Sequence, residues 1–278
     1  MNASKLKSSR AAKIAILGAG NIGSSIARGL AASGRWNPAD ITLTRRRAEL
    51  LESFRKEKFG VTSDNRAAVK RANIIILAVG PQQAEGLVKE IRPALKGGHI
   101  LISIVSGVTT EQVAGWAGKK ARVVRAMTNT AIAIREAMTC LCAAPGDKAA
   151  LEEAREIFDA LGKTVVISEE LMLPATALTG CGIAFFLRSI RAASQGGIQI
   201  GFHSEEALLM AAQTARGAAS LLLRGHGHPE GEIDKVTTPL GCTIEGLNEM
   251  EHHGFSSSMI RGIVTSNNRA AHLFKKEE

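Results

Sequence analysis

The sequence predicts an α/β fold in its first half and an all-helical second half. Three observations carry this prediction. Residues 13–30 combine a short apolar run, a glycine-rich turn and a helical pattern of small residues. Short apolar runs then alternate with helical patterns as far as residue 167, which is typical of parallel strands covered by helices. From residue 168 onward the pattern is helical only.

Length and composition indicate a soluble protein of two domains. The chain has 278 residues, of which 45% are hydrophobic and 22% charged. We see no apolar run of the roughly 18–20 residues that a membrane span needs, and therefore expect no membrane partner. Residues 1–12 are basic but lack the apolar core of a secretory signal, so we expect a disordered leader. The domains are then expected at residues 13–167 and 168–278.

The basic net charge does not indicate nucleic-acid binding. The formal charge is +9, but the basic residues are scattered apart from Arg45, Arg46 and Arg47. Two Trp and no Tyr leave few side chains to stack on bases. We expect no nucleic-acid partner, and a phosphate-rich cofactor accounts for the local cluster. Four cysteines without a CxxC pattern are typical of small core residues in a reducing compartment.

The glycine-rich turn predicts a dinucleotide site. Gly18-x-Gly20-x-x-Gly23 directly follows an apolar strand and opens a helix. The first glycine allows the tight turn, the second lets the backbone approach a pyrophosphate, and the third lets the helix pack on its strand. Free N–H groups at the helix start would then bind the phosphates. The alternative is a glycine-rich turn between two buried elements.

The second strand, at residues 41–44, predicts which cofactor is bound. An acidic residue at the end of this strand would bind the ribose 2′-hydroxyl of NAD. Arg45 and Arg46 stand there instead, and guanidinium groups bind a 2′-phosphate through charge-assisted hydrogen bonds. The sequence therefore favours NADPH over NADH. The alternative is an ordinary basic start of a helix.

The other elements of the first half follow in α/β order. Gly80-Pro81 and Ser106-Gly107 close two buried strands, at the sheet edge where ligands bind in this architecture. The predicted strands are 61–65, 74–79, 100–105, 122–126, 138–143 and 163–167, and the predicted helices are 48–58, 82–95 and 148–161.

The second half is expected to form long helices that pack against another copy of the chain. We predict helices at 171–200, 204–224, 243–253 and 256–274, with Ser204 as an N-cap ahead of two acidic residues. Frequent small residues between 211 and 219 allow close helix contact. Because such long apolar helices cannot bury their surfaces in so small a segment, we predict a homodimer.

The loop at residues 236–244 is a candidate anion site. Small residues that open a helix leave N–H groups able to hold a carboxylate, and Thr238 and Thr243 add hydroxyl donors. The alternative is a plain helix cap made by Thr237 or Thr238. No metal site is expected, because no pattern of carboxylates or cysteines adds further metal ligands to the histidines. These are His226, His228, His252 and His253.

Together these features resemble the pyrroline-5-carboxylate reductase family over about residues 13–274. The matching stretches, in family order, are ILGAGNIG (16–23), AVGPQ (78–82), SIVSGVT (103–109), VVRAMTNT (123–130), LTGCGIAF (178–185) and HPEGEIDKVTTPLGCTIEGL (228–247). The resemblance implies an N-terminal Rossmann domain and a helical domain that interlocks into dimers, often into larger rings. It also implies cytoplasmic reduction of 1-pyrroline-5-carboxylate to L-proline with NAD(P)H, the last step of proline biosynthesis.

Site residues are carried over by position. Thr238, Gly241, Cys242 and Thr243 would hold the substrate, with the Thr243 hydroxyl as the catalytic hydrogen-bond partner of the ring nitrogen. The cofactor would contact Ile16, Leu17, Gly18, Ala19, Gly20, Asn21, Ile22, Gly23, Arg45, Arg46, Asn65, Ala78, Val79, Gly80, Pro81, Ser106 and Gly107.

The chain also departs from the family pattern near the expected site. Gly80 replaces a lysine, and Leu240 stands where a small residue should approach the substrate carboxylate. Further departures are Thr128, Ala131, Cys181 and Ile183. Two alternatives therefore stay open: a related reductase for another cyclic imine or oxo acid, and an NADPH-binding protein with weak catalysis.

Overall fold

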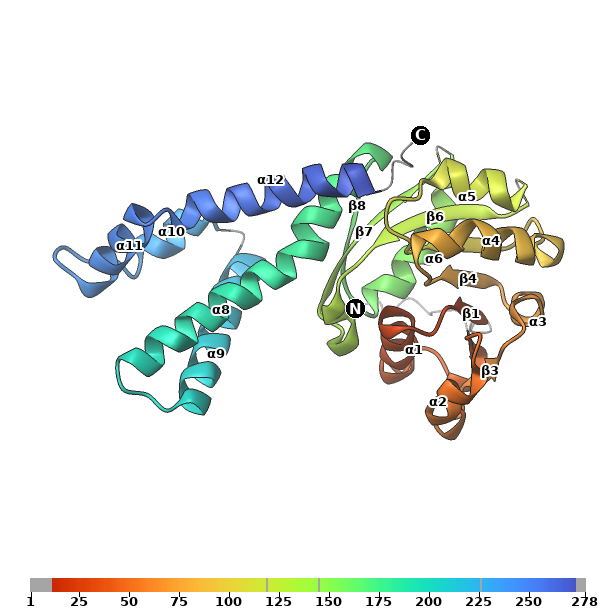
Figure 1. The fold of residues 1–278 in the computed structure, drawn as a ribbon, viewed down its shortest axis with the longest axis horizontal. Helices are drawn as coiled ribbons and strands as arrows, with labels where there is room; N and C mark the ends of the chain where they lie inside the picture. Colours follow the sequence, from red (N-terminus) through yellow and green to blue (C-terminus); the bar gives the residue numbers. More distant parts are fainter. Residues whose placement is uncertain (1–11, 119, 145, 226, 274–278) are drawn as a thin grey trace, which may run out of the picture. The chain divides into compact units, whose positions relative to one another are not determined.

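The structure is a computed structural model that describes residues 12–118, 120–144, 146–225 and 227–273. It contains two compact units (Figure 1): of the described residues, one comprises those from 12 to 180 and from 267 to 273, and the other those from 181 to 266. The expected leader, apart from residue 12, lies outside the described residues. The domain boundary at residue 168 stays a prediction.

The first unit is built on an eight-stranded sheet in the order β3-β2-β1-β4-β5-β6-β7-β8. Strands β1 to β6 are all parallel to one another. Strand β7 pairs antiparallel with β6, and β8 pairs parallel with β7. Every residue of β1, β4 and β5 is buried, as continuous apolar runs predict for strands covered on both faces. The strands are β1 (Ile14–Leu17), β2 (Ile41–Thr44), β3 (Gly60–Thr62), β4 (Ile74–Leu77), β5 (Ile100–Ser103), β6 (Arg122–Met127), β7 (Ala137–Ala143) and β8 (Gly162–Val166).

Two hydrophobic clusters cover the two faces of this sheet, which gives the α/β sandwich that the sequence predicts. Alternate residues of β1 face opposite clusters: Ile16 packs with helices α1 and α6, and Leu17 with α3, α4 and α5. The helices are α1 (Asn21–Ala32), α2 (Glu52–Lys56), α3 (Asn65–Arg71), α4 (Pro81–Ile91), α5 (Thr110–Ala117) and α6 (Lys148–Asp159). Short 3-10 turns flank them at Pro38–Asp40, Ala48–Leu51, Arg92–Ala94 and Thr130–Ile134.

Several predicted elements differ from those observed. The expected helix at 48–58 is a 3-10 turn followed by the short α2, and the chain then turns at Lys58, whose φ is 67°. Asn65 does not end an extended segment but begins α3, because the Asp64 side chain accepts a hydrogen bond from the Ala67 N–H and caps that helix. Helix α5 was not expected either, although Thr109 and Gln112 form a capping box.

The predicted helix at 171–200 is interrupted. A 3-10 turn (Glu169–Leu171), α7 (Met172–Ala175) and a π-helical segment (Thr176–Cys181) precede α8 (Gly182–Gln199). Pro174 supplies no N–H to a regular ladder, and the Thr176 and Thr179 hydroxyls donate to carbonyls four residues earlier. These features favour a local rearrangement of the helical hydrogen bonds.

The second unit contains α8, α9 (Ser204–Gly225), α10 (Pro229–Asp234), α11 (Cys242–His252) and most of α12 (Phe255–Leu273). Helix α9 starts at Ser204, so His203 takes the N-cap position and the predicted Ser204 cap is wrong. The Glu206 carboxylate accepts from the His203 N–H. Helix α10, which was not predicted, begins at Pro229 behind an N-cap at His228.

The segment Glu169–Gln199 is long and apolar enough to cross a membrane by length and composition, with a mean hydropathy of 1.5 over a stretch of 18 residues within it. The expectation that no stretch reaches this length therefore has to be corrected. One such helix is weak evidence for a membrane span, because an apolar helix of a soluble protein can have the same length and composition.

Candidate functional site

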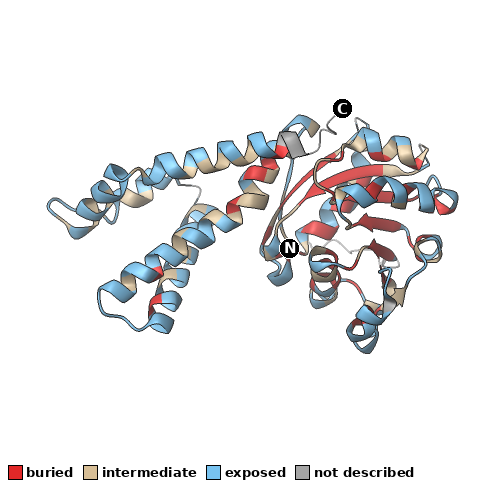
Figure 2. Ribbon diagram, viewed as in Figure 1, coloured by how far each residue is buried: buried red, intermediate tan, exposed pale blue. Residues whose placement is uncertain are grey.

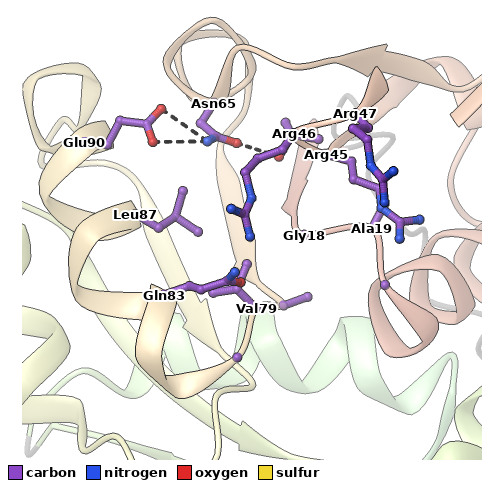
Figure 3. A pocket seen from close by; sticks show the side chains of 14 residues that line it. Gly18, Ala19, Arg45, Arg46, Arg47, Asn65, Val79, Gln83, Leu87 and Glu90 are labelled. Atoms are coloured by element: carbon purple, nitrogen blue, oxygen red, sulfur yellow. Dashed lines mark hydrogen bonds between the residues drawn. The ribbon is translucent and has the colours of Figure 1, made fainter. Parts of the chain in front are cut away.

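A cavity of about 830 Å³ opens at the carboxyl ends of β1, β2 and β4 (Figure 3). This is the sheet edge at which ligands bind in doubly wound α/β proteins. The lining residues all belong to the first unit, and they are Gly18, Ala19, Gly20, Thr44, Arg45, Arg46, Arg47, Asn65, Ala78, Val79, Gly80, Gln83, Leu87 and Glu90.

The glycine-rich turn forms one wall of the cavity. Gly18 has a φ of 104°, which favours glycine, and a Cβ there would overlap the Ala78 carbonyl. The Gly18 and Ala19 N–H groups donate to the Thr44 carbonyl at 3.2 and 2.9 Å, which ties the turn to the end of β2. Gly20 has open space where a side chain would stand, so a ligand can approach its backbone.

Helix α1 begins directly behind this turn with Gly20 as its N-cap. No side chain caps the helix, and its first turn carries no acidic residue. The first intrahelical bond runs from the Ser24 N–H to the Gly20 carbonyl, so the N–H groups before it have no helical partner. The helix dipole and these donors make this end suitable for a phosphate.

Three consecutive arginines follow β2 and line the cavity. Arg45, Arg46 and Arg47 are all exposed and carry no carboxylate partner within ion-pair distance among the described residues. In Figure 3 the Arg46 side chain reaches toward Gln83 on α4, and the other two lie on the side of Ala19. Three unpaired cations in one concave site attract a polyanion.

The opposite wall is one face of α4, which sequence reasoning missed. Gln83, Leu87 and Glu90 are spaced by four and three residues and therefore share a face of this helix. That spacing was visible in the sequence, but nothing in it indicated that this face borders the cavity. Thr44 and Arg47 were missed as well.

Nine of the seventeen predicted cofactor residues line this cavity: Gly18, Ala19, Gly20, Arg45, Arg46, Asn65, Ala78, Val79 and Gly80. The structure buries Ile16 and Leu17 in β1, and it buries Gly23 in α1. Asn21 and Ile22 lie in the first turn of α1, Pro81 begins α4, and Ser106-Gly107 follow β5; none of these lines the cavity.

The predicted substrate residues gather at the start of α11 in the second unit. Gly241 is the N-cap of this helix without a side-chain cap, so neither Thr237 nor Thr238 caps the start of α11. The Thr237 hydroxyl instead donates to the Asp234 carbonyl at the end of α10. The first intrahelical bond of α11 runs from the Glu245 N–H to the Gly241 carbonyl, which leaves the N–H groups of Cys242 and Thr243 without a helical partner.

Leu240 and Gly80, two of the positions that depart from the family pattern, differ in backbone conformation. Leu240 is 96% exposed and has a φ of 59°, a conformation that glycine adopts at lower cost. Gly80 has a φ of −65°, and a Cβ there would meet only the Gln82 side chain, at 3.5 Å. The backbone therefore does not require glycine at position 80, and a Cβ is accommodated there.

A partly buried ionic network lies outside the cavity, and sequence reasoning did not find it. Arg125 on β6, 5% exposed in its side chain, pairs with Glu169 at 2.5 Å. The Glu169 carboxylate also accepts from the Thr110 hydroxyl and the Cys142 thiol. Burial tends to raise the pKa of Glu169, but these bonds outweigh it and lower the pKa. Burial, together with the bond to Glu169, raises the pKa of Cys142 to about 12.

Within the described part of the chain, no group of three or more His, Cys, Asp or Glu side chains could hold a metal ion. His226, one of the histidines considered from the sequence, lies outside the described residues.

Comparison with known proteins covers almost the whole chain. Residues 169–273 match the family model described as pyrroline-5-carboxylate reductase dimerisation, and residues 13–107 match NADP oxidoreductase coenzyme F420-dependent. Pyrroline-5-carboxylate reductase 1 of Dictyostelium discoideum is 50% identical over 95% of this chain, which spans only 50% of that protein. Pyrroline-5-carboxylate reductase 2 of the same organism is 45% identical, over 96% of this chain and 94% of that protein.

A solved structure agrees with these sequence relatives. The pyrroline-5-carboxylate reductase of Coxiella burnetii is 31% identical to this chain and superposes with a TM-score of 0.88, over 96% of this chain and 100% of that one. The glycine-rich pocket, the helical second unit and these matches agree with one another. The chain belongs to the pyrroline-5-carboxylate reductase family.

Proposed function

We propose that this protein reduces 1-pyrroline-5-carboxylate to L-proline, with NADPH as the cofactor. The observation that carries the proposal is the match to a reductase of this name along nearly the full length of both chains. The cavity at the carboxyl edge of the sheet supplies a site for the cofactor.

The residues of the cavity fit a phosphorylated dinucleotide. The uncapped start of α1 offers N–H donors for a pyrophosphate, and open space beside Gly20 admits it. Arg45 and Arg46 would bind a 2′-phosphate, and β2 ends without the acid that would repel one. When bound, NADPH supplies the hydride that reduces the carbon–nitrogen double bond.

The loop before α11 would bind the substrate carboxylate. The free N–H groups of Cys242 and Thr243 and the positive end of the helix dipole attract a carboxylate, and the exposed Thr238 hydroxyl adds a donor. We assign Thr243 to the ring nitrogen, where its hydroxyl orients and polarises the imine. A threonine hydroxyl is a poor general acid, so the proton comes from water or from a substrate already protonated on nitrogen.

The assembly proposed is a homodimer through the helical unit, with a larger ring as an extension, in the cytoplasm. Figure 2 shows that α8, α9 and α12 carry few buried positions in the single chain. Large apolar side chains are exposed on them, including Phe186, Leu187, Leu209, Leu223 and Ile260. Single subunits rarely leave apolar patches of this kind uncovered. The dimerisation description of residues 169–273 supports the same proposal.

The test is to follow NADPH absorbance with purified protein and 1-pyrroline-5-carboxylate, with NADH in parallel. We expect NADPH consumption with an equal amount of proline formed. The variant Arg46→Gln tests the cofactor assignment. It should weaken the binding of NADPH more than the binding of NADH. Binding of NADPH without turnover of this substrate would contradict the proposal.

A second candidate substrate class is another cyclic imine or an oxo acid. The exposed Leu240 in the expected carboxylate loop and the missing cation at position 80 favour it. In that case turnover appears with a six-membered cyclic imine or an oxo acid and is absent with 1-pyrroline-5-carboxylate.

A further inference from the structure

A chain of hydrogen bonds runs along one side of the cavity from the end of β2 to α4 and holds the carboxylate of Glu90. The buried Thr44 hydroxyl donates to Asn65 Oδ1 at 2.6 Å, and Asn65 Nδ2 donates to both carboxylate oxygens of Glu90, at 3.2 and 3.3 Å (Figure 3). Both ends of the Asn65 carboxamide are therefore held. The Glu90 carboxylate is held beside the cavity as a result.

The main chain of Glu90 is fixed as well. Arg66 Nε donates to the Glu90 carbonyl at 2.7 Å, so this guanidinium binds the backbone of Glu90. Within the described part of the chain, no lysine or arginine forms an ion pair with the Glu90 carboxylate. Glu90 thus presents a carboxylate that forms no ion pair with a described lysine or arginine to a cavity that also holds three arginines.

This charge acts differently on the two nicotinamide cofactors. A 2′-phosphate carries more than one negative charge at neutral pH and is repelled by a nearby carboxylate, whereas a ribose 2′-hydroxyl can donate a hydrogen bond to it. The acid that binds this hydroxyl in many Rossmann domains is missing from the end of β2. Glu90 on α4 brings an acid to the same cavity, and Asn65 links it to Thr44 at the end of β2.

We propose that Glu90 is a specificity-determining residue, which reduces the preference for NADPH over NADH that the arginines create. The proposal rests on the cofactor site of the proposed function. The Thr44–Asn65–Glu90 chain holds the carboxylate in place, so the opposing charge is a fixed property of the pocket.

The test is the variant Glu90→Gln, in which a neutral carboxamide can still accept from Asn65 Nδ2. The probes are adenosine 2′,5′-bisphosphate and adenosine 5′-monophosphate, which differ only in the 2′-phosphate, followed by NADPH and NADH. Their dissociation constants are measured by calorimetry or nucleotide fluorescence. The matched control is Glu85→Gln, which removes the same charge from α4 at a residue that does not line the cavity and is paired with Lys89.

In Glu90→Gln we expect the Kd of the bisphosphate and of NADPH to fall about three- to tenfold, while the Kd of the monophosphate and of NADH does not fall. The difference should shrink as salt is raised, because screening weakens a charge effect. Equal tightening of both probes, no tightening of the bisphosphate, or the same change in Glu85→Gln would overturn the proposal. So would failure of the wild type to bind either probe, which would also remove the cofactor site.

These binding measurements separate the two proposals. A protein that shows the expected shift but does not turn over 1-pyrroline-5-carboxylate retains the role of Glu90 and loses the proposed substrate.

Discussion

At the residue scale, position 240 shows how a single side chain conflicts with its backbone. Leu240 holds a positive φ in an exposed loop directly before the N-cap of α11. A residue with a Cβ pays about 1 kcal/mol for this conformation, which glycine avoids. The loop therefore keeps a glycine-like backbone although its residue is leucine.

We expect Leu240→Gly to raise kcat/KM for 1-pyrroline-5-carboxylate about threefold, because it removes a side chain and its strain from the carboxylate loop. The control is Leu240→Ala, which shortens the side chain and keeps the strained backbone. Steady-state kinetics of both variants would decide this, and a lower kcat/KM in the glycine variant would contradict it.

Thr243 carries the chemical prediction at this scale. If its hydroxyl orients the ring nitrogen, Thr243→Ala should lower kcat/KM about tenfold or more, with NADPH affinity unchanged. Thr243→Ser keeps the hydroxyl and should restore most of the rate. An unchanged kcat/KM in the alanine variant removes Thr243 from the mechanism.

At the element scale, the Arg125–Glu169 ion pair connects the segment between β8 and α7 to the sheet. Glu169 stands in a 3-10 turn and binds side chains from β6, β7 and the first turn of α5. Its loss would leave the buried Arg125 charge without a counter-ion, and Arg125 Nε has no partner within the described residues even in the native protein. The position of this turn therefore depends on the ion pair with Arg125, which is distant in the sequence and cannot be inferred from the residues around Glu169.

We expect Glu169→Gln to lower the free energy of unfolding at pH 7 by about 2 kcal/mol, reduced from the value of a fully buried pair because Glu169 is one-third exposed. The pKa of Glu169 is lower in the folded protein than in the unfolded chain. Its stabilisation is thus complete above the unfolded pKa and is lost as pH falls through the folded one.

Urea unfolding of wild type and variant from pH 7 down to pH 3 measures this effect. The gap in stability should narrow as the pH falls below about 4.3, the usual pKa of glutamate. Glu170→Gln, at the exposed neighbouring residue, is the control and should change stability little. A gap that does not vary with pH would assign the loss to packing and not to charge.

At the scale of the whole molecule, the helical unit carries more exposed apolar surface than a subunit working alone would be expected to show. Leu209 is 70% exposed and Leu223 is 71% exposed, both on α9. The strands at the centre of the first unit's sheet are, by contrast, fully buried. This contrast is expected if the helical unit completes its core with a second copy.

Light scattering at micromolar concentration should therefore give at least twice the mass of 29.4 kDa. Leu209→Glu should shift the mass toward a single chain, because it places a charge in the surface that a partner would cover. The matched control is Leu50→Glu, the same change at an exposed leucine of the first unit. A monomeric wild type would contradict the dimer.

The sequence by itself determined the features that depend on local pattern. The buried strand β1, the glycine turn at Gly18 and the arginines after β2 could be predicted because backbone conformation and burial on both faces leave direct marks in residue type and spacing. The family followed from the order of such motifs. The sequence was therefore sufficient to predict the sheet, the glycine-rich side of the pocket and the class of cofactor.

Only the tertiary structure decided which distant residues meet. Glu90 lies 25 residues after Asn65, and Glu169 lies 44 residues after Arg125, and neither pair leaves a periodic signal along the chain. Crossover connections bring α4 beside the end of β2, and β6 beside the turn before α7, and contacts between such elements depend on topology and not on local propensity. The hydrogen-bonded carboxylate of Glu90 and the Arg125–Glu169 ion pair are products of that topology.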